Sequence, residues 1–280
     1  MRVIDENSVD KVAEMKKNYK KLELDCIVVL GGNGTQKTAN LLREEGLNVV
    51  SLPKTIDNDL WGTDKTFGFQ SAVDIATNVI DCIHTTATSH GRVFIVEVMG
   101  HKVGWLTLYA GIAGGADVIL IPEIPYDINS VINTIKKRTE SGKKFSILAV
   151  AEGAISKELA AMPKKKRKAA MAEIAYPSIS YKIAKEIQDA TGQETIVTVP
   201  GHFQRGGSPD AYDRVLSTRF GIAAAELIIN GDYGKMVALV NNKVVAVPLE
   251  EIAGKLKAVP ADHEIVAAAR KMGICFGDEK

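Results

Sequence analysis

Five short apolar runs in this chain each lead into a cluster of glycine or polar residues, and this repeated arrangement most limits how it can fold. Residues 26–30 (CIVVL) are wholly apolar, which is typical of a parallel strand buried on both faces. Helical patterns separate the runs, and that alternation favours a parallel sheet flanked by helices. The runs and their clusters are 26–30 before GGNGT, 48–52 before TIDND, 92–99 running into MGH, 145–150 before AE, and 195–199 before GHFQRGG.

The five clusters predict a ligand site. Open parallel sheets bind ligands beyond the carboxyl ends of their strands, and all five clusters fall at such ends.

The remaining pattern predicts strands at 116–123 and near 236–247, and it places Gly46 at the C′ position that ends the second helix. The expected helices cover residues 9–21, 35–45, 69–88, 103–113, 128–139, 176–190 and 210–229.

Composition narrows the class of protein. With 280 residues, 46% of them apolar and 25% charged, the chain is expected to be soluble and to hold one large or two ordinary domains. A net charge of +1 gives no reason to expect nucleic acid as a partner, and no apolar run reaches the roughly 18 residues of a membrane span. The acidic N-terminus is unlike a signal peptide, and the cysteines show no CxxC spacing. These features predict a cytoplasmic protein with no membrane partner.

The first cluster is a candidate phosphate cradle. Gly31, Gly32 and Gly34 let the backbone approach an anion closely, and a helix expected to begin near Thr35 directs N–H groups toward the same place. A single glycine turn after a strand is more often a simple connection. The neighbouring PKTIDND cluster makes the cradle interpretation the stronger one.

The second cluster carries the candidate catalytic groups, Asp57, Asp59 and Thr55. A carboxylate can take the proton from an attacking hydroxyl, and a threonine hydroxyl can contact a phosphate. The alternative is a purely structural Asx turn, for which Asp-Asn-Asp is well suited. Because the motif follows an expected parallel strand beside a glycine turn, we favour catalysis.

In these residues the chain resembles the ATP-dependent 6-phosphofructokinase family, which includes pyrophosphate-dependent members. The matching motifs are GGNGT, PKTIDND, GTDKTFGFQSA, VEVMG, AGIAGGAD and GHFQRGGSP. The resemblance implies a kinase that phosphorylates the 1-hydroxyl of fructose 6-phosphate in glycolysis, with ATP as co-substrate and Mg²⁺. It also implies two similar three-layer α/β/α domains with mostly parallel sheets and a homo-oligomer, a tetramer or dimer.

The resemblance sets the expected domains. Residues 1–68 with 209–254 are expected to bind nucleotide, and 69–208 with 255–280 to bind the sugar phosphate. The family begins with a strand and a GGxxxGxN turn, and no such motif precedes Cys26. The first domain is therefore expected to be truncated at its N-terminus, either because the chain is a fragment or because its start lies upstream.

The resemblance also assigns roles to individual residues. Asp57 corresponds to the catalytic base, while Asp59 orients it or holds water on magnesium. Asn33 stands where the family has an aspartate near magnesium, so it is the candidate metal ligand. Its amide oxygen can coordinate the ion but lacks the negative charge of a carboxylate. Ile196 and His101 stand where the family commonly has arginine. The expected nucleotide-binding residues are Gly31, Gly32, Asn33, Gly34, Thr35 and Lys54, and the expected sugar-phosphate residues are Arg92, Met99, Gly100, Glu152, His202 and Arg205.

Two positions bear on the phosphoryl donor. Pyrophosphate-dependent members have aspartate at the position of Gly34 and lysine at that of Lys54, whereas many ATP enzymes have glycine at both. Glycine at 34 leaves room for the α-phosphate, so ATP is favoured over pyrophosphate. A non-catalytic, truncated sugar-phosphate-binding subunit is the other alternative. The basic run 163–168 (PKKKRK) is interpreted as a solvated loop or helix end rather than as a nucleic-acid site.

Overall fold

The computed structural model describes residues 11–173 and 175–279. The chain divides into two compact units, Met1–Gln70 with Pro209–Lys257, and Ser71–Ser208 with Ala258–Lys280. Each unit is an α/β layer structure built on its own four-stranded sheet.

The sheet of the first unit has the order β1-β2-β7-β8. Three of its strands, β1 (Ile27–Gly31), β2 (Val49–Pro53) and β7 (Lys235–Val240), are parallel, and β8 (Lys243–Pro248) is antiparallel to β7. The β7–β8 turn consists of Asn241 and Asn242, both with positive φ, as a two-residue hairpin turn requires. In the described part of the chain β1 lies at the sheet edge, and its side chains at Val28 and Leu30 are exposed.

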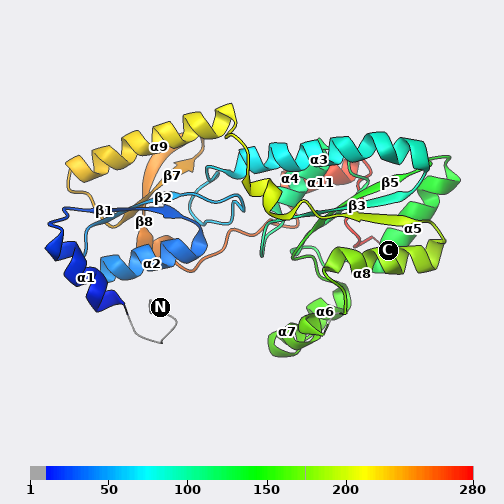
Figure 1. The fold of residues 1–280 in the computed structure, drawn as a ribbon, viewed down its shortest axis with the longest axis horizontal. Helices are drawn as coiled ribbons and strands as arrows, with labels where there is room; N and C mark the ends of the chain where they lie inside the picture. Colours follow the sequence, from blue (N-terminus) through cyan, green and yellow to red (C-terminus); the bar gives the residue numbers. More distant parts are fainter. Residues whose placement is uncertain (1–10, 174, 280) are drawn as a thin grey trace. The chain divides into compact units, whose positions relative to one another are not determined.

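Helices cover both faces of this sheet (Figure 1). One face packs on α1 (Val12–Lys21), α2 (Asn33–Glu44) and α10 (Leu249–Ile252), and the other packs on α9 (Ala211–Ile229). The alternation of side chains along a strand produces the two cores, since Val49 faces α2 while Val50 faces α9.

The second unit has a fully parallel sheet of order β4-β5-β3-β6. Helices α5 (Ile128–Glu140) and α8 (Ile179–Thr191) pack on one face of it. Helix α4 (Trp105–Ala113) packs closely on the other, where a Cβ added to Gly111 would lie 2.8 Å from the Ile119 side chain. The remaining elements are β3 (Val93–Val98), β4 (Val118–Leu120), β5 (Ser146–Ala151), β6 (Thr195–Thr198), α3 (Phe69–His90) and α11 (Glu264–Lys271).

These observations confirm the predicted fold class, two three-layer α/β units with mostly parallel sheets. The expected strands and helices are present with shifted ends, although residues 9 and 10 of the first expected helix lie outside the described residues. The strand expected at 116–123 is shorter because the chain turns after Ile121, whose carbonyl accepts the Ile124 N–H at 3.2 Å. Gly46 has φ +85° after the last turn of α2, as its predicted C′ position requires.

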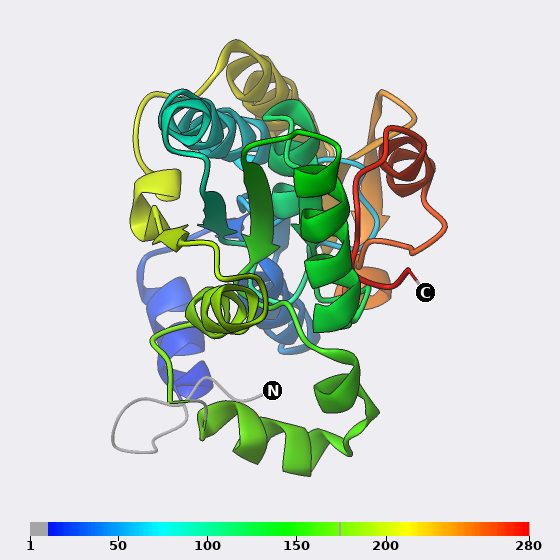
Figure 2. The same ribbon diagram turned by 90° about the vertical axis from the view of Figure 1, so that its right-hand side faces the viewer.

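The basic run 163–168 belongs to a helical excursion of the second unit. Most of it lies in α7 (Lys164–Ala172), which follows the short helix α6 (Lys157–Ala161). Both helices project away from the sheet of their unit (Figures 1 and 2), and the basic side chains are largely exposed. Pro163 occupies the N-cap position of α7, so the run begins a helix rather than forming a loop. Among the described residues, no helix is long and apolar enough to cross a membrane.

Candidate functional site

The glycine turn joins β1 to α2 in the first unit. Gly32 is the N-cap of α2, which begins at Asn33, so the unpaired N–H groups of the first turn lie at the end of β1. A Cβ added to Gly31 would stand 2.4 Å from the Thr35 hydroxyl oxygen, so only glycine fits there. A Cβ added to Gly34 would meet no atom within 4 Å. The turn therefore presents helix N–H groups beside open space, as an anion cradle needs.

A buried glutamine ties this turn to the neighbouring strand. The side chain of Gln36 is 1% exposed, and its amide nitrogen donates to the carbonyls of Gly31 at 3.0 Å and Leu52 at 3.3 Å. Its amide oxygen accepts the hydroxyl of Ser51, which is also buried. The ends of β1 and β2 are thus held together by one side chain that the sequence analysis did not single out.

The PKTIDND loop follows β2 and lies against the glycine turn. The N–H of Lys54 donates to the Gly31 carbonyl at 3.1 Å, and a Cβ added to Gly32 would lie 3.4 Å from Thr55 Cβ. The Thr55 hydroxyl accepts the Asp57 N–H at 3.1 Å. The loop therefore contains a local side-chain turn and also lies beside the cradle, so the structural and catalytic interpretations are compatible.

Asn58 fixes the backbone between the two aspartates. It adopts φ +53°, a left-handed conformation that asparagine tolerates better than most residues, and its side chain is 2% exposed. Its amide oxygen accepts the Thr66 N–H at 3.1 Å and the Lys257 ammonium at 3.0 Å. Asp59 is 6% exposed, whereas Asp57 is half-buried.

Lys257 reaches this loop from the far end of the unit's sequence. Besides Asn58, its ammonium donates to the carbonyls of Thr63 at 2.7 Å and Asp64 at 2.9 Å. Burial of the ammonium, together with the nearby Lys65, lowers the pKa of Lys257 to about 7, while Asp64 and Asp59 oppose the shift. No motif or spacing pattern in the sequence points to this residue.

Asn33, the candidate metal ligand, lies on the first turn of α2. Its amide nitrogen donates to the Lys255 carbonyl at 2.8 Å, which fixes the orientation of the side chain. Within the described ranges, no group of three or more His, Cys, Asp and Glu side chains is arranged to hold a metal ion.

The second unit gathers another set of predicted residues at the ends of β3 and β5. One carboxylate oxygen of Glu152 accepts the N–H groups of Gly100 at 3.1 Å and His101 at 2.7 Å. Gly100 has φ +150°, and a Cβ there would lie 2.6 Å from the Val103 carbonyl, so this tight turn requires glycine. Glu152 and the Met99-Gly100 turn are therefore directly connected.

Gln204 connects this turn to the loop that follows β6. It lies in the short 3₁₀ helix η1 (Gly201–Arg205) and is 1% exposed. Its amide oxygen accepts the Met99 N–H at 3.2 Å, and its amide nitrogen donates to the Gly201 carbonyl at 3.2 Å. The helix η1, which carries His202 and Arg205, is thereby joined to the same cluster.

Arg92 is not brought to this cluster. It directly precedes β3, whereas Met99 follows that strand, and six strand residues span about 20 Å. Its guanidinium instead pairs with Glu194 at 2.7 Å. Of the two positions where arginine was expected, Ile196 lies within β6 and His101 has an exposed side chain in the turn after β3.

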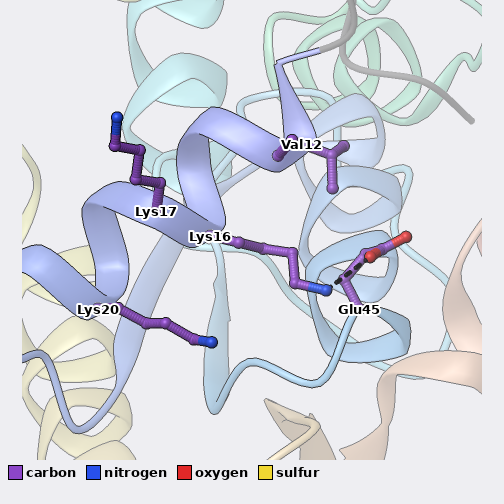
Figure 3. A pocket seen from close by; sticks show the side chains of 6 residues that line it. Val12, Lys16, Lys17, Lys20 and Glu45 are labelled. Atoms are coloured by element: carbon purple, nitrogen blue, oxygen red, sulfur yellow. Dashed lines mark hydrogen bonds and ion pairs between the residues drawn. The ribbon is translucent and has the colours of Figure 1, made fainter.

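A surface pocket beside α1 lies away from the predicted residues. Its lining consists of Val12, Ala13, Lys16, Lys17, Lys20 and Glu45. Lys16 pairs with Glu45 at 3.0 Å (Figure 3). Glu45 follows the last turn of α2, at the opposite end of a 12-residue helix from the glycine turn. That length corresponds to about 18 Å, so this pocket is separate from the candidate cradle.

Comparison with known proteins agrees with the geometry. The family model described as Phosphofructokinase matches residues 2–228. An ATP-dependent 6-phosphofructokinase of Spirochaeta thermophila is 61% identical over 96% of this chain and 73% of its own length, and ATP-dependent 6-phosphofructokinase 3 of Bacteroides thetaiotaomicron is 53% identical over 97% and 76%.

Solved structures show the same fold. The phosphofructokinase of Saccharomyces cerevisiae matches 86% of this chain and 34% of its own chain, with TM-score 0.73 and 31% identity. A pyrophosphate-dependent phosphofructokinase of Nitrosospira multiformis matches 96% and 68%, with TM-score 0.78 and 21% identity, which supports the fold alone. With the family model covering most of the sequence and relatives this similar along nearly all of it, the chain belongs to the phosphofructokinase family.

Proposed function

We propose that this protein transfers the γ-phosphoryl group of ATP to the 1-hydroxyl of fructose 6-phosphate, giving fructose 1,6-bisphosphate and ADP. The observation that carries the proposal is the contact between the glycine turn and the PKTIDND loop, where the Lys54 N–H meets the Gly31 carbonyl and Thr55 lies against Gly32. An anion cradle and a carboxylate-bearing loop side by side are what phosphoryl transfer requires.

In this proposal Asp57 is the general base. A sugar hydroxyl is barely acidic, so a carboxylate within hydrogen-bonding reach accepts its proton as the bond to phosphorus forms. The N–H groups of Gly32 and the first turn of α2 stabilise the phosphate charge. Thr55 presents its hydroxyl beside the same turn, and the Asp57 N–H already contacts that hydroxyl at 3.1 Å.

The residues of the loop suit magnesium. Mg²⁺ is usually held by one or two carboxylates together with substrate phosphates, and Asp59 would supply such a carboxylate beside the base Asp57. When bound, the ion neutralises charge on the transferring group. Asn33 is a weaker candidate because its amide is already engaged with Lys255. Magnesium, the homo-oligomer and the cytoplasmic location stay predictions.

The second unit is proposed to bind the sugar phosphate. Arg205 offers its guanidinium to the 6-phosphate, for which this planar cation is well suited, and His202 offers a ring N–H donor. Glu152, Met99 and Gly100 form the connected turn that contacts the sugar. Arg92 is a less direct candidate because it lies at the other end of β3.

The replacement Asp57→Asn tests the proposal. It keeps the size of the side chain but cannot accept a proton, so we expect turnover to fall by about 10²–10⁴-fold with fructose 6-phosphate affinity largely unchanged. Single-turnover formation of fructose 1,6-bisphosphate measures the first quantity and equilibrium binding the second. A variant within tenfold of wild type would rule out Asp57 as the base, and a wild-type protein that binds the sugar without turnover would favour the non-catalytic alternative.

Pyrophosphate is the alternative donor, and the space around Gly34 favours ATP. Because no atom lies within 4 Å of a Cβ built at Gly34, the α-phosphate of a nucleotide has room there. We expect faster turnover with ATP than with pyrophosphate at equal concentration. Gly34→Asp places a carboxylate in that space, so it should weaken ATP use selectively through charge repulsion, while pyrophosphate use changes less. Faster turnover of the wild type with pyrophosphate contradicts the assignment.

A further inference from the structure

Lys257 shapes the loop that carries Asp57 and Asp59. Its ammonium donates to three oxygens of one segment, the Asn58 side chain at 3.0 Å and the carbonyls of Thr63 and Asp64 at 2.7 and 2.9 Å. Its own N–H donates to the Asp59 carbonyl at 2.9 Å. Lys257 therefore contacts this loop at Asn58, at Asp59 and at the segment formed by residues 63 and 64.

The Asn58 amide oxygen is the point where these contacts meet. It accepts both the Lys257 ammonium and the Thr66 N–H, and Asn58 itself holds a left-handed backbone conformation. A left-handed residue between two aspartates sets the directions in which both carboxylates leave the backbone. The orientation of Asn58 is held in turn by its two hydrogen-bond donors, because they fix which way its amide points.

We propose that Lys257 is a positioning residue for phosphoryl transfer, holding the Asp57–Asp59 segment in its reactive conformation through Asn58 and the carbonyls of Thr63 and Asp64. The proposal rests on the role assigned to Asp57 in the proposed function. Lys257 lies 199 residues from Asn58 in sequence, yet both belong to the first unit. The charged groups that face its ammonium are Lys65, Asp64 and Asp59.

The test compares Lys257→Met with Lys243→Met in the full chain. Methionine keeps most of the side-chain length and removes every donor, while Lys243 is an exposed lysine on β8 of the same unit and serves as the matched control. For Lys257→Met we expect kcat to fall by about 10- to 100-fold, as small misplacement of catalytic groups produces. The KM for fructose 6-phosphate should change less than about threefold, because the residues proposed to bind it belong to the second unit.

Amide hydrogen exchange separates positioning from general destabilisation. In Lys257→Met the amides of residues 57–66 should exchange at least about tenfold faster, while those of β2 and β7 keep wild-type rates. A kcat within threefold of wild type overturns the proposal, and so does equal acceleration in the loop and in both strands.

If Lys257→Met does not fold, Lys257→Arg provides the test, since it retains charge and donors. Any change in its exchange must then be confined to the loop, and a change spread over β2 and β7 contradicts the proposal. The exchange measurement does not depend on the role of Asp57, so failure of the proposed function, seen with Asp57→Asn, is distinguishable from failure of this inference.

Discussion

The buried ammonium of Lys257 makes a specific prediction for the pH dependence of stability. Burial and the neighbouring Lys65 hold its pKa near 7, compared with an ordinary value of 10.5. Between these two values the unfolded chain binds the proton and the folded chain releases it. Stability therefore rises with pH in this window, because the unfolded state binds more protons, and it falls as pH decreases from 10.5 toward 7.

The size of the effect follows from the two pKa values. Each pH unit over which the unfolded chain alone holds the proton changes the free energy of unfolding by about 1.4 kcal/mol. From pH 7 to pH 9, with half of the folded chains still protonated at the lower end, Lys257 contributes a rise of about 2 kcal/mol. Lys257→Met removes this titration, so the variant lacks the rise.

Urea unfolding at pH 7 and pH 9 measures the prediction. Trp61 lies in the first unit and Trp105 in the second, so a Trp105→Phe background leaves Trp61 to report on the unit that contains Lys257. The free energy of unfolding should rise by about 2 kcal/mol more in the wild type than in Lys257→Met, with Lys243→Met behaving as wild type. If wild type and Lys257→Met change in parallel to within about 0.5 kcal/mol, the ammonium is not titrating in this range and the reasoning fails.

Two further sites give sharp tests. Gln36→Met deletes the partner of the buried Ser51 hydroxyl and should lower the free energy of unfolding by about 1–3 kcal/mol. The double variant Gln36→Met/Ser51→Ala should lose less stability than the sum of the losses in the two single variants, as measured by a double-mutant cycle in urea. Gly100→Ala brings a Cβ to 2.6 Å from the Val103 carbonyl, so the turn must shift and fructose 6-phosphate binding, measured calorimetrically, should weaken by about tenfold or more. Additive losses of stability in the double-mutant cycle contradict the hydrogen bond between Gln36 and Ser51. Unchanged affinity of Gly100→Ala for fructose 6-phosphate contradicts the tight approach of Gly100 to the Val103 carbonyl.

The sequence predicted the parts of the fold that depend on local pattern. Apolar runs followed by glycine or aspartate give the parallel strands and the loops at their carboxyl ends, because buried strands and glycine turns have distinctive compositions. The strand β8 was predicted but its antiparallel direction was not, although the two residues Asn241 and Asn242 between the apolar runs are a hairpin signal that could have indicated it. For the basic run 163–168 the sequence left a loop and a helix end as alternatives, because a lysine run is as typical of a loop as of an exposed helix, and the structure has the helix.

The side chains that hold the loops were mostly beyond prediction. Lys257 and Gln204 contact backbone groups far away in sequence, and a contact to a backbone carbonyl or N–H leaves no spacing pattern between residue types. Gln36 is the exception. It stands about one turn before the buried Ala39 and nearly two turns before the buried Leu42, so a polar residue on the apolar face of α2 was visible in the sequence.

The residues missed from sequence share one physical role in the two units. Gln36 and Lys257 in the first unit, and Gln204 in the second, each give a long polar side chain to backbone groups at or just beyond the carboxyl end of a strand. Loop backbone lacks a ladder partner, so its polar groups need such side chains once they are removed from water. The groups proposed to do the chemistry are thus kept in place by residues that touch no reactant. Replacements of Gln36 and Lys257 should therefore act mainly on kcat and on loop exchange. Replacement of Gln204, which holds the Met99-Gly100 turn and η1, should act mainly on the affinity for the sugar phosphate, as should replacement of His202 or Arg205.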